Sequence, residues 1–538
     1  MTDIIIIGGG ISGLTTAHEL CMLGYKVTII ERNDIVGGLA RTYQNKENKI
    51  CPYEYSWRAY ASFYYNVYNI MKQIPYDGNL SVYDKLLDIE EKKVTCNKNY
   101  LDFYNKRNTV MRNMPLHCKF LLLQYLCSCN KRNCDNFSDI KIKDYINDSN
   151  ISIEIENILG KSVGPILGFD YQFASLYDLL HFYEMLYNNK SNKTKTNITS
   201  LPTSYVWFDK WVDLLKSKGV IFLLNTETIS YNINNNIITS ITVLDKLTNK
   251  FNKYIANYFI NCTGPEILSK LLKQHSNISK NINVYYNNID KVATLGRQQL
   301  LSVYYYLDTK IYLRYEYSCI YLPNTPWLLM VLPTGHIWGD SFLSEYCDSK
   351  IKEVVSIAIC ESHIDGLLIK KPWSECTVDE IKIETWFQLI NDKDFINSSC
   401  INKNINDINI IDFKLWDSYI FKDGKLDTFE PKWSNNINTI KYRPTNISPF
   451  KNLIISGAYT KTSVNFYSME GAVESGKMAA KTLCKIDNKK ENIYLHIKKT
   501  FKIFKIMRFI DEILYLCNLN FFHLILIILF YIFILRKK

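Results

Sequence analysis

Three glycines near the start of the chain are spaced as if to bind the two phosphates of a dinucleotide. The stretch DIIIIGGGISGLTTAHEL runs from Asp3 to Leu20 and contains the pattern Gly8-x-Gly10-x-x-Gly13. Gly8 suits a tight turn, Gly10 leaves room for a pyrophosphate, and Gly13 lets a helix pack closely on a strand. The N–H groups at the start of that helix, with the positive end of its dipole, attract phosphate. The alternative is a glycine-rich turn that holds no ligand.

An acidic residue follows at the spacing that ribose recognition needs. Glu31 stands at the end of the next apolar run, eighteen residues after Gly13. A carboxylate at this point can accept both hydroxyl hydrogens of an adenosine ribose. Because the glycines follow a strand pattern, open a helix pattern and precede this acid, the sequence predicts dinucleotide binding.

A second glycine pair lies directly after Glu31. The stretch ERNDIVGGLART (31–42) places Gly37 and Gly38 between Arg32 and Arg41. A second close backbone approach beside two arginines suits the other side of a pyrophosphate. This second turn favours FAD over NAD as the dinucleotide.

Two distant segments extend the pattern. One is LLNTETISY (223–231) followed by YIANYFINCTGP (254–265), and the other is NLIISGAYT (452–460) followed by SMEGAVESGKMAAKTL (468–483). Together with the glycine turns, they resemble the FAD-dependent amine oxidase and phytoene desaturase superfamily, the flavin-containing amine oxidoreductase family. Rab GDP-dissociation inhibitors are similar to this family in fold.

The resemblance implies how the segments contact a bound FAD. Thr228 would flank the adenine, Gly457 would lie near the ribityl–pyrophosphate link, and the N–H groups around Met469 would face the isoalloxazine carbonyl. Ala458 stands where the family often has an acidic residue, a departure that would weaken flavin binding. No cysteine lies near Gly457, so we expect non-covalent FAD. The predicted FAD-binding residues are Gly8, Gly10, Ser12, Gly13, Glu31, Arg32, Gly37, Gly38, Leu39, Arg41, Thr228, Gly264, Gly457 and Met469.

The resemblance also implies the chemistry. FAD would take hydride from a substrate C–H bond onto flavin N5, and O2 or a quinone would reoxidise it. Amine oxidases of this family line the flavin face with aromatic rings, which makes Phe466 and Tyr467 the candidate catalytic residues. Glu54 and Arg58 follow the second glycine turn and are interpreted as structural. The cysteines and histidines show no zinc-ligand spacing, so no metal site is predicted.

The elements that must position these residues follow from the local pattern. Residues 3–7 and 26–30 predict buried strands, and residues 14–23 between them predict a helix. This βαβ unit predicts an α/β, Rossmann-type FAD-binding domain with a parallel sheet. An inserted α+β substrate domain and a C-terminal membrane helix complete the expected fold.

The predicted domain boundaries split the FAD-binding domain into three parts. They are 1–80, 201–270 and 436–485 for the FAD-binding domain, 81–200 for a helical substrate or membrane-proximal region, 271–435 for the substrate sheet, and 486–538 for a basic amphipathic segment and transmembrane tail. Within the helical region, CKFLLLQYLCSC (118–129) predicts a buried helix, with a membrane-dipping segment as the alternative.

Charge and apolar residues concentrate at the C-terminus. The formal net charge is +11, and eleven Lys/Arg against four Asp/Glu lie from Lys485 onward. No basic cluster lies on the folded part, so a nucleic-acid partner is not predicted. The unbroken apolar run FFHLILIILFYIFIL (521–535) ends in RKK, which favours a membrane anchor over a buried helix. We expect an intracellular, membrane-anchored protein with a cytoplasmic catalytic part and reduced thiols.

The functional prediction is an FAD-dependent oxidoreductase of the amine oxidase type. Its substrate would be a small molecule, either an amine or a lipid or polyene. One alternative on the same fold is a carotenoid or isoprenoid desaturase or isomerase. A second is a non-catalytic binding protein like the GDP-dissociation inhibitors, which the second glycine pair and the Met-Glu-Gly-Ala helix argue against.

Overall fold

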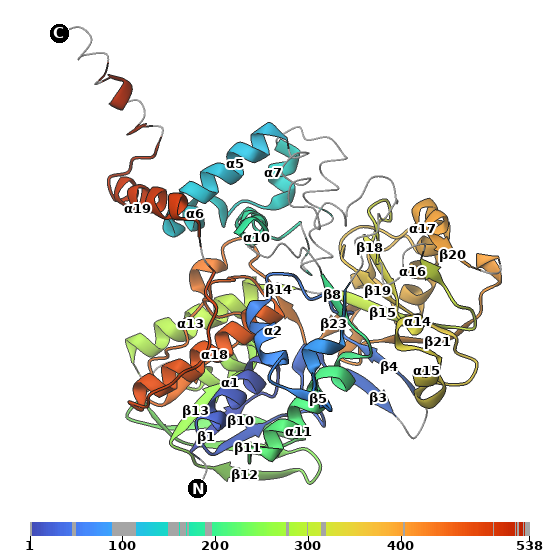
Figure 1. Ribbon diagram of the computed structural model, residues 1–538, viewed down its shortest axis with the longest axis horizontal. Coiled ribbons are helices and arrows are strands. Elements are labelled where there is room, and N and C mark those ends of the chain that lie inside the picture. Colours follow the sequence, from blue (N-terminus) through green and yellow to red (C-terminus); the bar gives the residue numbers. More distant parts are fainter. Residues whose placement is uncertain are drawn as a thin grey trace.

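The computed structural model describes most of the chain. The described residues are 3–45, 50–88, 115–148, 161, 168, 170, 172–188, 196–275, 279–298, 300–313, 319–401, 404–498, 500–521, 523–524, 527–530 and 532. Figure 1 shows three regions, with a sheet-and-helix body at the lower left, a second sheet region at the right and a group of helices at the top.

A five-stranded parallel sheet forms the centre of the body. Its strand order is β25-β13-β1-β2-β9, with β1 (Ile4–Ile7), β2 (Val27–Ile30), β9 (Ile221–Leu223), β13 (Tyr258–Asn261) and β25 (Leu453–Ile455). Every neighbouring pair is parallel, as continuous β-branched runs buried on both faces require. These strands fall in all three ranges predicted for the FAD-binding domain, whose exact boundaries stay predictions.

The two faces of this sheet are covered differently. Ile4 and Ile6 face a core shared with α1 (Ile11–Met22) and α18 (Met469–Ile486). Ile5 and Ile7 face a core shared with the antiparallel sheet β10-β11-β12 and with two helices. Those elements are β10 (Thr226–Asn234), β11 (Ile237–Asp245), β12 (Lys250–Tyr254), α12 (Pro265–Lys273) and α13 (Lys280–Leu295). The predicted βαβ unit is confirmed.

A second five-stranded sheet, entirely antiparallel, lies within the region predicted for the substrate sheet. Its order is β17-β18-β19-β15-β21, and its strands are β15 (Leu301–Leu307), β17 (Ile320–Leu322), β18 (Leu329–Pro333), β19 (Glu353–Ile359) and β21 (Ile410–Leu415). Four helices accompany it, α14 (Gly335–Trp338), α15 (Asp340–Tyr346), α16 (Val378–Asn391) and α17 (Lys393–Ser398).

Four of the helices at the top of Figure 1 come from the chain between the first two predicted parts of the FAD-binding domain. They are α5 (Leu116–Cys127), α6 (Asn130–Phe137), α7 (Ile142–Asp148) and α10 (Leu176–Asn188). The helix predicted at 118–129 is confirmed as α5, and it is buried on one side only. Phe120 and Leu123 are largely exposed, whereas Leu122 and Leu126 are buried.

Shorter elements connect these regions. They are β3 (Thr42–Asn45), β4 (Ile50–Glu54), α2 (Tyr65–Met71), β5 (Pro75–Asp77), β6 (Leu80–Ser81), β7 (Leu86–Asp88), β8 (Asn197–Thr199), α11 (Asp209–Ser217), β14 (Arg297–Gln298), β16 (Tyr312–Leu313), β20 (Ser399–Cys400), β22 (Tyr419–Lys422), β23 (Lys425–Thr428) and β24 (Lys432–Trp433).

Two cysteines correct the expectation that all thiols are reduced. Cys51 on β4 and Cys347 after α15 form a disulfide, with Cα atoms 4.4 Å apart. They are 296 residues apart in sequence, so only the folded chain brings them together. The bond ties the segment after the second glycine turn to the substrate sheet region.

The first part of the C-terminal segment packs against the helices of the body. The part predicted to be basic and amphipathic forms α19 (Lys502–Leu516), which packs against α5 and α6. In the part of the chain that the structure describes, no helix is both long enough and apolar enough to cross a bilayer. The predicted C-terminal membrane helix is therefore unsupported, and residues 522, 525–526, 531 and 533–538 of the apolar run and its basic end lie outside the described residues.

A substitution in α18 tests its close contact with α1. A Cβ at Gly476 would lie 2.7 Å from the Ser12 carbonyl oxygen and 2.7 Å from Thr15 Cβ. Gly476→Ala should therefore lower the free energy of unfolding by about 1–3 kcal/mol through overpacking, although alanine favours a helix elsewhere. Lys485→Ala on the exposed end of α18 is the control, with a change within about 0.5 kcal/mol. Denaturant unfolding measures both, and a stabilised Gly476→Ala variant would contradict the contact.

Candidate FAD-binding site

The first glycine turn lets strand β1 and helix α1 meet at backbone distance. Gly8 adopts φ +103°, a conformation that favours glycine. A Cβ built at Gly8 would lie 3.1 Å from the backbone of Cys262. A Cβ at Gly13 would lie 2.0 Å from the Gly8 carbonyl oxygen. Gly13 is therefore required for α1 to pack on β1, and it does not line the cavity described below.

Gly10 has a different environment. It is the N-cap of α1 and has no side chain to satisfy the first N–H groups of the helix. The nearest atom to a Cβ built there is the Gly38 Cα, 3.8 Å away, so space remains in front of it. The helix N-terminus, where negative charge is stabilised, thus opens onto free space.

The second glycine turn lies against the first. The Gly37 N–H donates to the Gly9 carbonyl over 2.8 Å, and a Cβ at Gly38 would lie 3.2 Å from Gly10 Cα. Gly37 and Gly38 have φ values of +114° and +56°. The two glycine turns therefore lie at backbone distance from each other, and their approach to a pyrophosphate stays a prediction.

Glu31 is buried beside the first turn. Its Oε2 accepts a hydrogen bond from the Gly9 N–H at 2.8 Å, and its Oε1 accepts from the Asn33 N–H and side-chain amide, each at 3.0 Å. Burial raises the pKa of the Glu31 carboxyl, against these hydrogen bonds and the charges of Arg41 and Arg32. The carboxylate keeps acceptor capacity on Oε2 toward the cavity that it lines.

A cavity of about 400 Å³ runs from the glycine turns into the interface with the substrate sheet. This volume lies in the range of small-molecule and cofactor sites. The three predicted FAD segments all reach it, together with residues of the substrate region. The predicted residues that line it are Gly8, Gly10, Ser12, Glu31, Arg32, Gly37, Gly38, Leu39, Thr228, Gly264, Gly457, Tyr467 and Met469.

Glu430 is the main residue of the cavity that sequence reasoning missed. Its carboxylate pairs with Arg41 and Arg32 at 2.9 Å each and accepts from Trp416 Nε1 at 2.8 Å. Burial opposes ionisation of Glu430, but the Arg41 and Arg32 charges lower its pKa. Both arginines predicted for the pyrophosphate thus share one acid, which offsets one of their two positive charges. Glu430 lies in the loop before β24 and has no local sequence signal.

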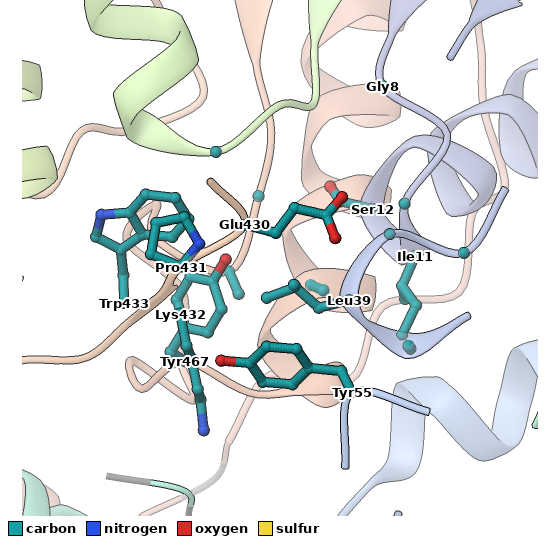
Figure 2. A pocket seen from close by; sticks show the side chains of 18 of the residues that line it. Gly8, Ile11, Ser12, Leu39, Tyr55, Glu430, Pro431, Lys432, Trp433 and Tyr467 are labelled. Atoms are coloured by element: carbon teal, nitrogen blue, oxygen red, sulfur yellow. The ribbon is translucent and has the colours of Figure 1, made fainter. Parts of the chain in front are cut away.

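The far end of the cavity is aromatic. Figure 2 shows Tyr55, Tyr467, Lys432 and Trp433 gathered on the side away from Gly8 and Ser12, with Glu430 and Leu39 between the two groups. Lys432 Nζ donates to the Gly168 carbonyl, and burial lowers its pKa to about 7. Burial raises the pKa of Tyr467 well above its usual value, so its hydroxyl stays protonated at neutral pH.

Several buried polar atoms of the cavity lining have no hydrogen-bond partner among the described residues. They are Thr228 Oγ1, Tyr459 Oη, Trp57 Nε1 and Ser302 Oγ. Unpaired buried polar atoms are costly, so they fit a site in which a polar ligand completes their hydrogen bonds. With the helix N-terminus, the open space at Gly10 and Glu31, these residues fit FAD. Within the described ranges, no cluster of three or more His, Cys, Asp or Glu is arranged to hold a metal ion.

Comparisons with known proteins agree with this geometry. Residues 6–74 match the model of the NAD(P)-binding Rossmann-like domain. An L-amino-acid oxidase of Echis ocellatus is 46% identical over 43 residues, 8% of this chain and 8% of that protein, so the chain matches only a small part of these curated relatives.

Two solved structures cover the chain more widely. Putrescine oxidase, bound to putrescine, has a TM-score of 0.57 at 11% identity over 90% of this chain and 99% of its own. Cyclohexylamine oxidase of Brevibacterium oxydans IH-35A has a TM-score of 0.53 at 12% identity over 91% of this chain and all of its own. The chain therefore has a Rossmann-like nucleotide-binding segment and shares its fold with these two amine oxidases.

One of the two predicted catalytic residues, Phe466, lies outside the cavity. Phe466 does not line the cavity, because its ring packs edge-on against Phe63, Phe182 and His181 in the core. It directly precedes Tyr467, which does line the cavity, and sequence alone could not separate the two orientations.

Three further residues have structural contacts. Arg41 lies outside the lining, between Glu430 and the Trp416 ring. Glu54 accepts hydrogen bonds from Thr42 Oγ1 and the Thr203 N–H, which agrees with its structural interpretation. Arg58 donates to the Leu39 carbonyl and also lines the cavity.

The charge of Glu430 generates a prediction. Glu430→Gln removes the acid that offsets one of the two charges of Arg41 and Arg32, so FAD should bind about tenfold more tightly, equivalent to about 1.4 kcal/mol. Fluorescence titration of deflavinated protein with FAD measures this. Asp427→Asn, which removes an equal charge from the exposed pair with Arg297, is the control and should leave the Kd unchanged. Weaker binding in Glu430→Gln would instead show that the acid is needed to position the arginines.

Proposed function

We propose that the protein is an FAD-dependent oxidoreductase of the amine oxidase type. The observation that carries the proposal is the single cavity with two chemically distinct ends. One end has two glycine turns, a helix N-terminus and Glu31, and the other has Tyr55, Tyr467, Trp433 and Lys432. A long dinucleotide with a redox ring at one end is a ligand of matching chemistry.

The FAD would be held by residues of all three segments. Gly10, Gly38 and the first turn of α1 would receive the pyrophosphate, and Glu31 would accept the ribose hydroxyl hydrogens. Thr228 and Gly264 would lie toward the nucleotide, and Gly457 and Met469 toward the flavin. In the sequence no cysteine neighbours Gly457, and we propose non-covalent binding on that ground. When bound, FAD would supply an acceptor at N5 for hydride from a substrate C–H bond.

The far end of the cavity would receive the substrate. Tyr55 and Tyr467 present aromatic surface that excludes water and orients an apolar stem, and the Tyr55 hydroxyl is fixed by donating to the Leu300 carbonyl at 3.1 Å. A neutral Lys432 can accept a proton or a hydrogen bond from an amine, whereas a charged Lys432 would repel a substrate cation. This chemistry favours an amine over a polyene. O2 or a quinone would then take the electrons.

The location of the protein is proposed from its C-terminal sequence and its disulfide. The basic, apolar C-terminus supports an intracellular protein attached to a membrane. The Cys51–Cys347 disulfide favours an oxidising compartment over the cytoplasm for the catalytic part.

The cofactor and substrate class can be tested on the full chain purified in mild detergent. We expect a yellow protein that releases FAD, identified by mass, and that bleaches anaerobically with small amines. Bleaching by polyenes and not by amines would favour the desaturase or isomerase alternative. A folded, colourless protein that does not bind added FAD would contradict the proposal and favour a non-catalytic binding protein.

The lowered pKa of Lys432 predicts that the rate of flavin bleaching by an amine depends on pH. Its pKa lies at about 7, far below that of an ordinary lysine, so it is protonated below and neutral above this pH. The anaerobic bleaching rate with an amine should therefore rise through about pH 7 in the wild type. Lys432→Met should lose this step while keeping its FAD. Lys441→Met, a substitution of an exposed lysine, should keep the step. The same step in Lys432→Met would contradict the role.

A further inference from the structure

The charged side chains in the centre of α19 face the protein. Asp511 is buried, where it accepts from the Cys129 N–H at 2.8 Å and pairs with Arg132 at 2.9 Å. Arg508 pairs with Glu184 of α10 at 2.9 Å and donates to the Leu126 carbonyl at 2.9 Å.

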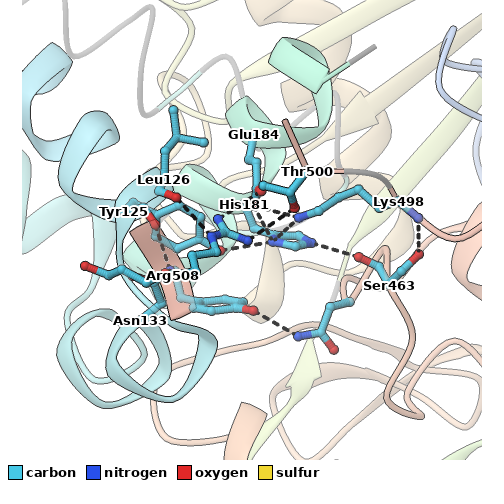
Figure 3. Close-up of polar contacts among 12 residues, drawn as sticks. Tyr125, Leu126, Asn133, His181, Glu184, Ser463, Lys498, Thr500 and Arg508 are labelled. Atoms are coloured by element: carbon cyan, nitrogen blue, oxygen red, sulfur yellow. Dashed lines mark hydrogen bonds and ion pairs between the residues drawn. The ribbon is translucent and has the colours of Figure 1, made fainter. Parts of the chain in front are cut away.

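The segment before α19 is fixed by the same acid. Figure 3 shows Glu184 between Arg508 and Lys498, and Lys498 Nζ lies 2.6 Å from its Oε2. Glu184 is buried, so its pairs with Lys498 and Arg508 are shielded from solvent. These contacts set the rotation of α19 about its axis.

The opposite side of α19 is apolar and open to solvent. Ile503, Ile506, Phe509, Ile513 and Leu516 recur every three or four residues, and between 51% and 75% of each is exposed. An amphipathic helix of a soluble domain normally turns its apolar stripe toward the core and its charges outward. In α19 the side toward the body carries Asp511 and Arg508 beside the buried Leu514, and the stripe of five apolar residues lies on the exposed side.

The neighbouring helix α5 also exposes an apolar stripe. Leu116, Phe120 and Leu123 have the same helical spacing, with 48% to 70% of each exposed. The two helices are in contact, and Cys127 Sγ lies 3.4 Å from Met507 Sδ. We refer to these eight residues as the α5–α19 face. Exposed apolar patches that are held rigidly mark interaction surfaces.

The charges beside this face indicate what covers it. Lys502 and Lys505 are exposed on α19, with Glu512 as the exposed acid of the helix. The chain then continues away from the body (Figure 1), and Ile527, Leu529 and Phe530 are also largely exposed. Apolar stripes flanked by lysines and continuous with a further apolar segment match the interface of an anionic bilayer.

We propose that the α5–α19 face docks on the surface of an anionic lipid bilayer, with α19 lying in the plane of the interface. This role is independent of the C-terminal run crossing the membrane, because the ion pairs of Asp511 and Arg508 with the body fix which side of α19 is exposed. It is also independent of the proposed function, since none of these residues lines the FAD cavity.

The test uses the full chain and vesicles of phosphatidylcholine and phosphatidylserine in equal amounts. In flotation, Ile506→Asp combined with Phe509→Asp should weaken partitioning at least about tenfold, because two apolar side chains lose their burial in lipid. Phe251→Asp, on β12 and equally exposed, is the control and should float as the wild type does. Unchanged flotation of the double variant would overturn the proposal.

A second measurement separates this face from the C-terminal run. Phe509→Trp should show added quenching by brominated lipid, and Phe251→Trp should show none. Vesicle binding without added quenching at position 509 would overturn the proposal, because lipid would then contact other residues only. A dimer in lipid-free solution that the double variant dissociates would also overturn it and identify the face as an interface between copies of this chain.

Discussion

The site depends on one steric constraint, the contact between β1 and α1 at the first glycine turn. A Cβ at Gly13 would meet the Gly8 carbonyl oxygen at 2.0 Å, so only glycine allows the helix to start this close to the strand. That approach aims the N-terminus of α1 at the cavity, where Gly10 leaves the helix end open. The second turn and β13 then pack against the same point, which brings three distant segments to one ligand site.

A second feature of the cavity is the balance of charge around that helix end. Arg32 and Arg41 lie near two buried acids, Glu31 and Glu430, while Lys432 lies at the far end of the cavity. Burial raises the pKa of Glu31 and lowers the pKa of Lys432, which favours the neutral form of each side chain. Glu430 is held ionised by Arg41 and Arg32. The charge that the cavity offers to a pyrophosphate is thus set by residues from both the nucleotide and the substrate regions, and not by the glycine motif alone.

The parts of the fold that were predictable are those with a local physical signature. The β-branched runs, the glycine spacing and Glu31 define the βαβ unit and the nucleotide end of the cavity. Glu430, Lys432 and the Cys51–Cys347 disulfide carry no such signature, because each takes its role from partners far away in sequence. Phe466 and Tyr467 show the limit most clearly, since adjacent aromatic residues point to the core and to the cavity respectively. In the helical region, the pattern of residues 118–129 predicted α5, but only the position of α19 shows which side of α5 faces solvent.

The account rests on the claim that the space in front of Gly10 belongs to the pyrophosphate of FAD. Gly10→Ala tests this directly, because a Cβ there is 3.8 Å from the nearest protein atom and should not disturb the fold. The measurement is the FAD affinity of deflavinated Gly10→Ala together with its unfolding free energy. The account predicts wild-type stability and at least about tenfold weaker FAD binding, a loss of about 1.4 kcal/mol. Wild-type FAD affinity in a stable Gly10→Ala protein would contradict it.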